Sequence, residues 1–116
     1  MKTILFCASL LATLAGCAAD PAPLAQVRLA EQSIAQAEAV GAMKDTAELA
    51  DAQRKLAAAL MALQAERHRQ ARLLAEQAEL DARLAEARVL NEKSHMEITE
   101  LNRRIKQLRE QLGALQ

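Results

Sequence analysis

The side chains that could act as nucleophiles or metal ligands are few in this sequence of 116 residues. They are two cysteines, Cys7 and Cys17, and two histidines, His68 and His95. Neither histidine has a histidine, cysteine or carboxylate four residues away, so neither lies in a metal-binding pattern. The sequence also has no glycine-rich phosphate loop and no serine with a base partner. We therefore expect no enzymatic activity and no metal or other cofactor, and a chemistry confined to a cysteine thiol.

The acidic residues are dispersed rather than paired for acid–base catalysis. Three of them precede a basic residue by four positions, in the order that stabilises a helix: Asp51–Lys55, Glu79–Arg83 and Glu100–Arg104. These pairs predict solvated helix surfaces.

Cys17 follows a stretch with the order of a secretory leader. Lys2 precedes an apolar run at residues 3–13, which is shorter than the helix of about 20 residues that spans a bilayer. The residues Leu14, Ala15, Gly16 and Cys17 then resemble the lipobox of bacterial lipoproteins, whose cysteine is acylated. We expect residues 1–16 to be a lipoprotein signal peptide and Cys17 to carry acyl chains, palmitate among them. The alternative is an ordinary signal peptide with Cys17 incidental.

Acylation of Cys17 would define where the protein is held. Three acyl chains give a firm attachment, because two already anchor a protein stably. The next residue is Ala18 rather than the aspartate that retains such lipoproteins in the inner membrane, so we expect the outer membrane, periplasmic side. Cys7 is removed with the leader, which leaves no partner for an internal disulfide.

The mature chain has the composition of an all-helical protein. Without Lys2, 14 basic residues face 15 acidic ones, and no aromatic residue remains because Phe6 lies in the leader. Such a chain has neither a charge excess for nucleic acid nor a ring to stack on bases or sugars. Alanine, the best helix former, supplies 24 of its 100 residues. We expect no nucleic-acid partner and no small-molecule substrate.

Apolar residues spaced three and four apart predict helices after a lipidated tether at residues 17–22. The first helix is predicted over residues 23–40 and ends at Gly41, with an apolar side made of Leu24, Val27, Ile34 and Ala37. The second is predicted to begin with Asp45 as N-cap and Glu48 as its capping-box partner. Its predicted apolar stripe is Leu49, Ala52, Leu56, Ala59, Leu60 and Leu63.

The third helix is predicted over residues 67–112, with a length of about 70 Å at 1.5 Å per residue. A turn near Ala65–His68 is predicted from a break in the stripe, which resumes at Leu73, Leu74 and Ala78. A continuous, kinked helix is the alternative. We expect residues 23–88 to form a small antiparallel three-helix bundle, from which residues 89–116 extend as a coiled coil.

The extension carries a heptad repeat that predicts association. Its apolar positions are Ile98, Leu101, Ile105, Leu108, Leu112 and Leu115, and the same frame continues back through Asn91 and Ser94 to Ala87, Leu84 and Leu80. Ile at a, Leu at d and one Asn at a favour a parallel two-stranded coiled coil. We expect this stripe to bind a second copy of the chain or a helical protein partner. Parallel pairing would bring Arg104 near Arg109 of the partner, so antiparallel pairing and packing on its own chain remain alternatives.

Two segments, residues 48–56 and 71–87, resemble an uncharacterised, domain-of-unknown-function family of small Ala-rich helical lipoproteins from Gram-negative bacteria. The resemblance covers residues 22–90 and implies a TPR-like helix–turn–helix, whose usual Gly-Asp turn is replaced here by Glu66-Arg67. Some relatives carry a peptidoglycan-binding domain of the outer-membrane protein A type after the helices. This sequence ends at Gln116, and we expect no such domain here.

Together these features predict an outer-membrane lipoprotein that faces the periplasm and acts as a helical interaction or scaffold protein of the cell envelope. The alternative is a purely structural spacer like the major murein lipoprotein, close to peptidoglycan. That protein is bound to peptidoglycan through a C-terminal lysine, whereas residues 113–116 contain none. We therefore expect any association with peptidoglycan to be non-covalent.

Overall fold

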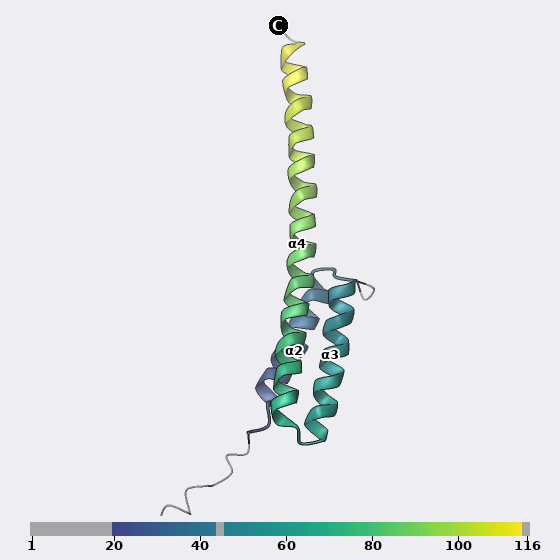
Figure 1. Ribbon diagram of the computed structural model, residues 1–116. Helices are drawn as coiled ribbons and strands as arrows, with labels where there is room; N and C mark the ends of the chain where they lie inside the picture. The colour runs from purple at the N-terminus through teal and green to yellow at the C-terminus, as the bar shows by residue number, and fades with distance from the viewer. Residues whose placement is uncertain (1–19, 44–45, 115–116) are drawn as a thin grey trace, which may run out of the picture.

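The computed structural model describes residues 20–43 and 46–114, which form three α-helices and no strand (Figure 1). The helices are α2 (Leu24–Ala39), α3 (Ala47–Gln64) and α4 (His68–Gly113). The all-helical fold is thus confirmed, and the predicted bounds of α2 and α4 agree within one residue. The lipobox at residues 14–17 lies outside the described residues, as do Asp45 and Leu115.

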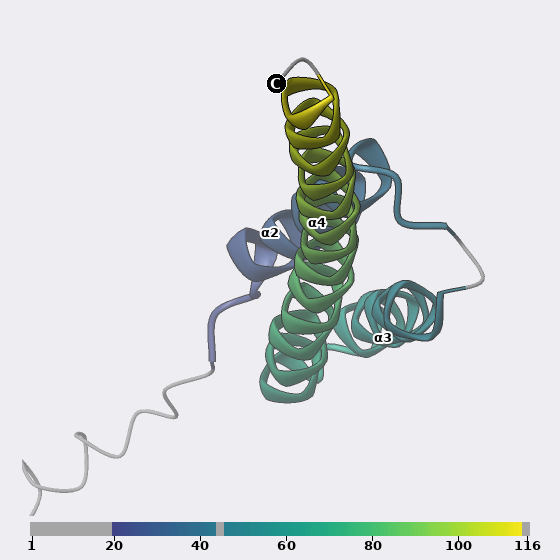
Figure 2. The same cartoon turned by 90° about the horizontal axis from the view of Figure 1, so that it is seen from above.

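Helix α4 is the element on which the other two helices pack. Its 46 residues make it about 69 Å long at 1.5 Å per residue. Both α2 and α3 lie against its first half (Figure 1), and they also contact each other less extensively. The view from above shows them on different sides of α4 (Figure 2). The second half of α4 continues alone beyond them, so the molecule is extended (Figure 1).

The core between the helices consists mainly of alanine. Residues Ala71, Ala75, Ala78, Ala82 and Ala85 of α4 are fully buried and form one face of that helix. Leu49 of α3 is the largest fully buried residue described, followed by Pro23, and Leu56 packs against both clusters of the core. Because alanine has no side chain beyond Cβ, the helices pack closely, and each contact buries little apolar surface.

The residues buried in this core differ in part from those predicted from the sequence. Leu24, Leu60 and Leu73 were expected to face the core, but all three are exposed. Val27, Ile34, Ala37, Leu49, Ala52, Ala59 and Ala78 are buried as predicted. Alanines occupy the lines of contact between the helices because closely packed helices leave no room there for a leucine. The leucines lie at the edges of these contacts.

Helices α2 and α3 end in the same hydrogen-bonded motif. After α2, the N–H of Gly41 donates to the carbonyl oxygen of Glu38 at 3.0 Å, and the N–H of Ala42 donates to that of Ala37 at 2.9 Å. This is the Schellman pattern, and Gly41 has the positive φ of 104° that it requires. The predicted end of the first helix at Gly41 is confirmed.

The turn after α3 repeats the pattern without a glycine. The N–H of Glu66 donates to Leu63 at 3.0 Å and that of Arg67 to Ala62 at 2.9 Å, while Glu66 has φ 56°. The turn predicted near Ala65–His68 is therefore present, and a continuous helix is excluded. Glu66 occupies a left-handed conformation that costs an L-residue about 1–2 kcal/mol.

Glu66→Gly is expected to stabilise the protein. Glycine removes the left-handed strain but raises the entropy of the unfolded chain, so the net gain is about 0.5–1 kcal/mol. Thermal unfolding followed by circular dichroism should show a midpoint higher by about 3–5 °C. The control is Glu31→Gly within α2, an exposed right-handed position, where about 1 kcal/mol is lost. A decrease at both positions would contradict the left-handed assignment of Glu66.

The start of α3 differs from the capping box that the sequence predicts. Thr46, with an extended backbone at φ −64° and ψ 127°, is the N-cap, and its side chain makes no capping hydrogen bond. The third helical residue is then Leu49, and the carboxylate of Glu48 instead pairs with Arg88 of α4 at 2.5 Å. The predicted box is wrong because Glu48 faces a cation on the neighbouring helix.

Candidate functional site: the outer face of α4

Helix α4 has a second apolar face that points away from the bundle. At about 100° per residue, Ala78 and Ala82 lie about 160° from Leu80, so Leu80 faces opposite to the buried alanines. Residues spaced three and four apart from Leu80 share its face along most of the helix. We call this face the outer stripe, and it consists of Leu73, Gln77, Leu80, Leu84, Ala87, Asn91, Ser94, Ile98, Leu101, Ile105, Leu108 and Leu112.

All residues of the outer stripe are exposed, including those beside the bundle. Its large apolar side chains have exposed fractions of 46–65%. The structure thus places the described residues of the predicted association stripe, Asn91 and Ile98 to Leu112, on one face of one straight helix. Packing of this stripe on its own chain, one of the sequence alternatives, does not occur among the described residues. Large apolar side chains exposed along one face are typical of interaction sites.

Two ion pairs between helices flank the stripe where α4 crosses α3. Lys55 pairs with Asp81 at 2.5 Å, in addition to the pair of Glu48 with Arg88. The sequence had predicted Lys55 to pair with Asp51, but Asp51 binds Arg54 at 2.7 Å instead. Lys55 is directed to α4 because it lies on the side of α3 next to the core, where a second carboxylate is available.

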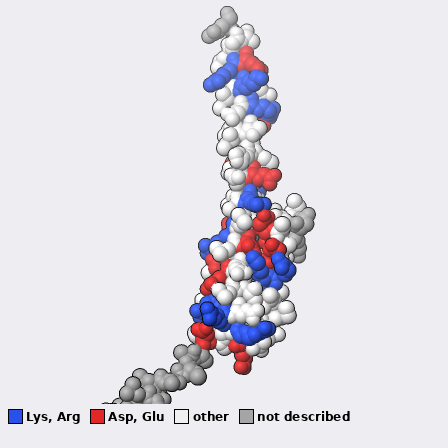
Figure 3. All heavy atoms as spheres, viewed as in Figure 1, with Lys and Arg blue, Asp and Glu red and all other residues white. Residues whose placement is uncertain are grey.

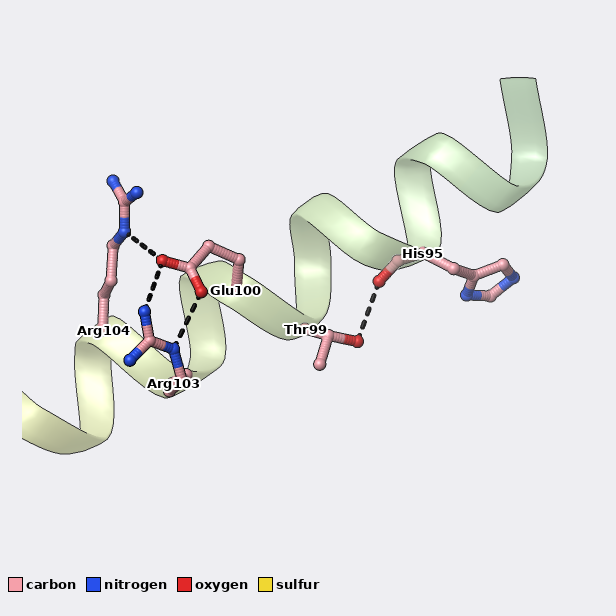
Figure 4. A network of polar contacts seen from close by, with 5 residues as sticks. All are labelled: His95, Thr99, Glu100, Arg103 and Arg104. Atoms are coloured by element: carbon pink, nitrogen blue, oxygen red, sulfur yellow. Dashed lines mark hydrogen bonds and ion pairs between the residues drawn. The ribbon is translucent and has the colours of Figure 1, made fainter. Parts of the chain in front are cut away.

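Two ion pairs predicted within α4 are present. Arg83 pairs with Glu79 at 2.6 Å. Glu100 accepts hydrogen bonds from Arg103 at 2.8 and 2.9 Å and from Arg104 at 2.7 Å (Figure 4). Hydrogen bonds from Arg103 and then Arg104 lower the pKa of Glu100 to about 2, and the same contact raises the pKa of Arg103. Glu100 is therefore ionised at neutral pH. Its hydrogen bonds hold the side chains of both arginines along α4.

The two histidines have structural contacts in different places. The Nδ1 atom of His68 lies 2.5 Å from the carbonyl oxygen of Asp20, which holds residue 20 at the start of α4. His95 lies in the extension, where its carbonyl oxygen accepts a hydrogen bond from Thr99 at 2.8 Å (Figure 4). Within residues 20–43 and 46–114, no group of three His, Cys, Asp or Glu side chains is arranged to hold a metal ion.

The surface around the bundle mixes both charges, whereas the extension has uncharged stretches between separate charged groups (Figure 3). A shallow apolar groove also runs between α2 and α3, lined by Leu24, Val27, Leu29, Leu60 and Leu63. It is much shorter than the outer stripe. Among the described residues, no helix is long and apolar enough to cross a membrane.

The chain is thus a small all-helical protein with a long exposed last helix, and it belongs to a family defined by sequence. Residues 25–101 match the family called domain of unknown function DUF4398, and the predicted family resemblance is confirmed. The crystal structure of a DUF4398 family protein from Pseudomonas aeruginosa PAO1 is 58% identical, with a TM-score of 0.79. The match covers 83% of this chain and all of that chain. No curated protein matches the sequence.

Proposed function

We propose that this protein is an outer-membrane lipoprotein on the periplasmic side that acts as a non-enzymatic helical scaffold of the cell envelope. The observation that carries the scaffold role is the outer stripe, an apolar surface along most of α4 that no other part of the described chain covers. The anchor is the acyl group expected on Cys17.

The contact between His68 and Asp20 supports a defined orientation of this scaffold. Asp20 lies three residues after Cys17, and three extended residues span at most about 10 Å. Because Asp20 touches the start of α4, an acylated Cys17 would hold that end of the helix close to the membrane. Helix α4 would then carry its other end about 70 Å away from the lipid.

We also propose that α2, α3 and the first half of α4 form an antiparallel bundle of the TPR-like kind. The ion pairs support this: Glu48 near the start of α3 meets Arg88, while Lys55, further along α3, meets the earlier Asp81 of α4. In this arrangement the extension, residues 89–116, serves as a coiled coil.

The alternative is a structural spacer that associates with peptidoglycan without a covalent bond. A spacer needs length and a solvated surface, and α4 has the length. A spacer role does not explain the large apolar side chains along the exposed face, because an isolated charged helix would serve equally well as a spacer. The outer stripe therefore favours the interaction scaffold.

Labelled palmitate fed to a Gram-negative host tests the anchor. The full chain and a Cys7→Ala control should be labelled and recovered with the outer membrane. Cys17→Ala should lose the label and move to the soluble periplasmic fraction, because its only acylation site is gone. Ala18→Asp should keep the label and move toward the inner membrane. Equal labelling of Cys17→Ala and the parent chain would refute the proposal.

A further inference from the structure

We propose that the partner of the outer stripe is a second copy of this chain, packed in parallel along α4 from the extension down onto the bundle. This deepens the proposed scaffold role and depends on it only for the common orientation of two chains anchored in one leaflet. The sequence alone indicates association by the extension. The structure adds that α2 and α3 leave Leu73, Leu80 and Leu84 exposed beside the bundle.

The outer stripe exposes as much apolar surface as a stable interface requires. The outer stripe has eight large apolar side chains, each roughly half exposed, which amounts to about 100 Å² apiece and 800 Å² per chain. A stable interface takes about 800 Å² from each partner. Five of the eight lie in the extension, and three lie beside the bundle. The bundle part of the stripe supplies the remainder.

The heptad pattern of the stripe is self-complementary. Ile98 and Ile105 occupy a positions, and Leu80, Leu101 and Leu108 occupy d positions. This combination favours two parallel strands, in which each residue meets its own twin. Asn91 at an a position would pair with Asn91 of the second copy and fix the register.

Charged residues lie on both sides of the stripe and bear on the orientation of the two copies. In a parallel dimer, each g residue faces the e residue five positions later in the other copy, and three such contacts join like charges. They are Glu76 with Asp81, Arg83 with Arg88, and Arg104 with Arg109. From the sequence alone, these contacts argue against parallel pairing.

The structure shows that each of these three contacts contains at least one charge already neutralised within its own chain. The intrachain pairs are Lys55–Asp81, Glu79–Arg83, Glu48–Arg88 and Glu100–Arg104. Two of the compensating residues, Glu48 and Lys55, come from α3. The bundle therefore lowers the repulsion that a bare α4 would meet, and the parallel arrangement becomes compatible with the flanking charges.

Cysteine crosslinking in membranes that contain the full chain tests this arrangement. Leu80→Cys and Leu101→Cys each place a thiol at a d position, where twin residues lie within the 4.4–6.8 Å Cα separation that a disulfide requires. After mild oxidation, most of each variant should shift to twice its mass on a non-reducing gel. Gln107→Cys, exposed at a c position on the same helix, is the matched control and should stay at the monomer mass.

Each other outcome has a definite meaning. Disulfide formation at Leu101→Cys without Leu80→Cys confines the interface to the extension and overturns the inference. If neither Leu80→Cys nor Leu101→Cys forms a disulfide, the parallel dimer is excluded in favour of another partner. If Gln107→Cys forms a disulfide to the same extent, the crosslinks result from random collision and the parallel dimer is likewise excluded. A disulfide dimer of the parent chain would show a free Cys17 thiol, which counts against acylation. The two variants would then be tested in a Cys17→Ala chain.

Discussion

Leu49→Asp is expected to abolish the cooperative unfolding of the bundle. Leu49 is fully buried in a cluster of alanines and Ile34, against which the partly buried Leu56 and Val89 also pack. A carboxylate there has no cation to pair with in this apolar cluster, and burying it unpaired costs several kcal/mol. Removing the leucine side chain adds the loss of about 2–5 kcal/mol typical of a large-to-small core change.

The total exceeds what an alanine core can tolerate, because its stability should lie near the low end of 5–15 kcal/mol. Thermal unfolding by far-UV circular dichroism checks the prediction. Leu60→Asp, the same change on the same helix at a residue that is 38% exposed, is the matched control and should retain a cooperative transition. If Leu49→Asp melted at the temperature of the parent chain, the assignment of Leu49 to the core would be wrong.

The helices themselves were predictable because local signals agree. Alanine content, the spacing of apolar residues and Gly41 fix the element type and the end of α2 without tertiary information. The turn at Glu66 was less certain, since no glycine marks it. Its left-handed residue is held by hydrogen bonds and by the packing of α4 on α3, and such tertiary support leaves no local sequence signal.

The choice of buried residues was less predictable. Between Leu80 and Leu84 of α4, the buried residue is Ala82, although leucine is the more hydrophobic side chain. Periodicity finds both faces of the helix equally well, and it cannot tell which one packs on α2 and α3. A regular alanine row spaced four and three, from residue 71 to 85, was the available signal. The ion pairs of Glu48 and Lys55 depend on this choice, so they too escaped prediction.

The position of the outer stripe on one helix face was predictable, because a heptad frame requires no tertiary contacts. Its exposure beside the bundle was not, since that depends on which face α2 and α3 cover. The sequence also could not show that the flanking charges are compensated across helices. These two properties turn a local association motif into a surface that spans most of α4.

Ile105→Glu is expected to prevent the proposed dimerisation of the chain without its leader and Cys17, residues 18–116. Ile105 lies at an a position in the middle of the extension and is 46% exposed in the single chain. In the parallel dimer, the variant would place two carboxylates opposite each other in an apolar seam. Losing two buried isoleucines and adding two desolvated charges costs about 3 kcal/mol or more, which weakens association by at least roughly 100-fold. Light scattering should show the parent as a dimer and the variant as a monomer.

The sign of this prediction depends on a competition between apolar burial and charge repulsion. Each fully buried Ile or Leu contributes about 1.5–3 kcal/mol, whereas an exposed like-charge contact such as Arg104 with Arg109 of the second copy costs at most about 1 kcal/mol. The pairing of Arg104 with Glu100 lowers that cost further. The control Gln107→Glu adds the same charge off the stripe and should leave the dimer intact. A parent chain that stays monomeric at high micromolar concentration would mean that the apolar term does not prevail, and that the outer stripe binds a different protein.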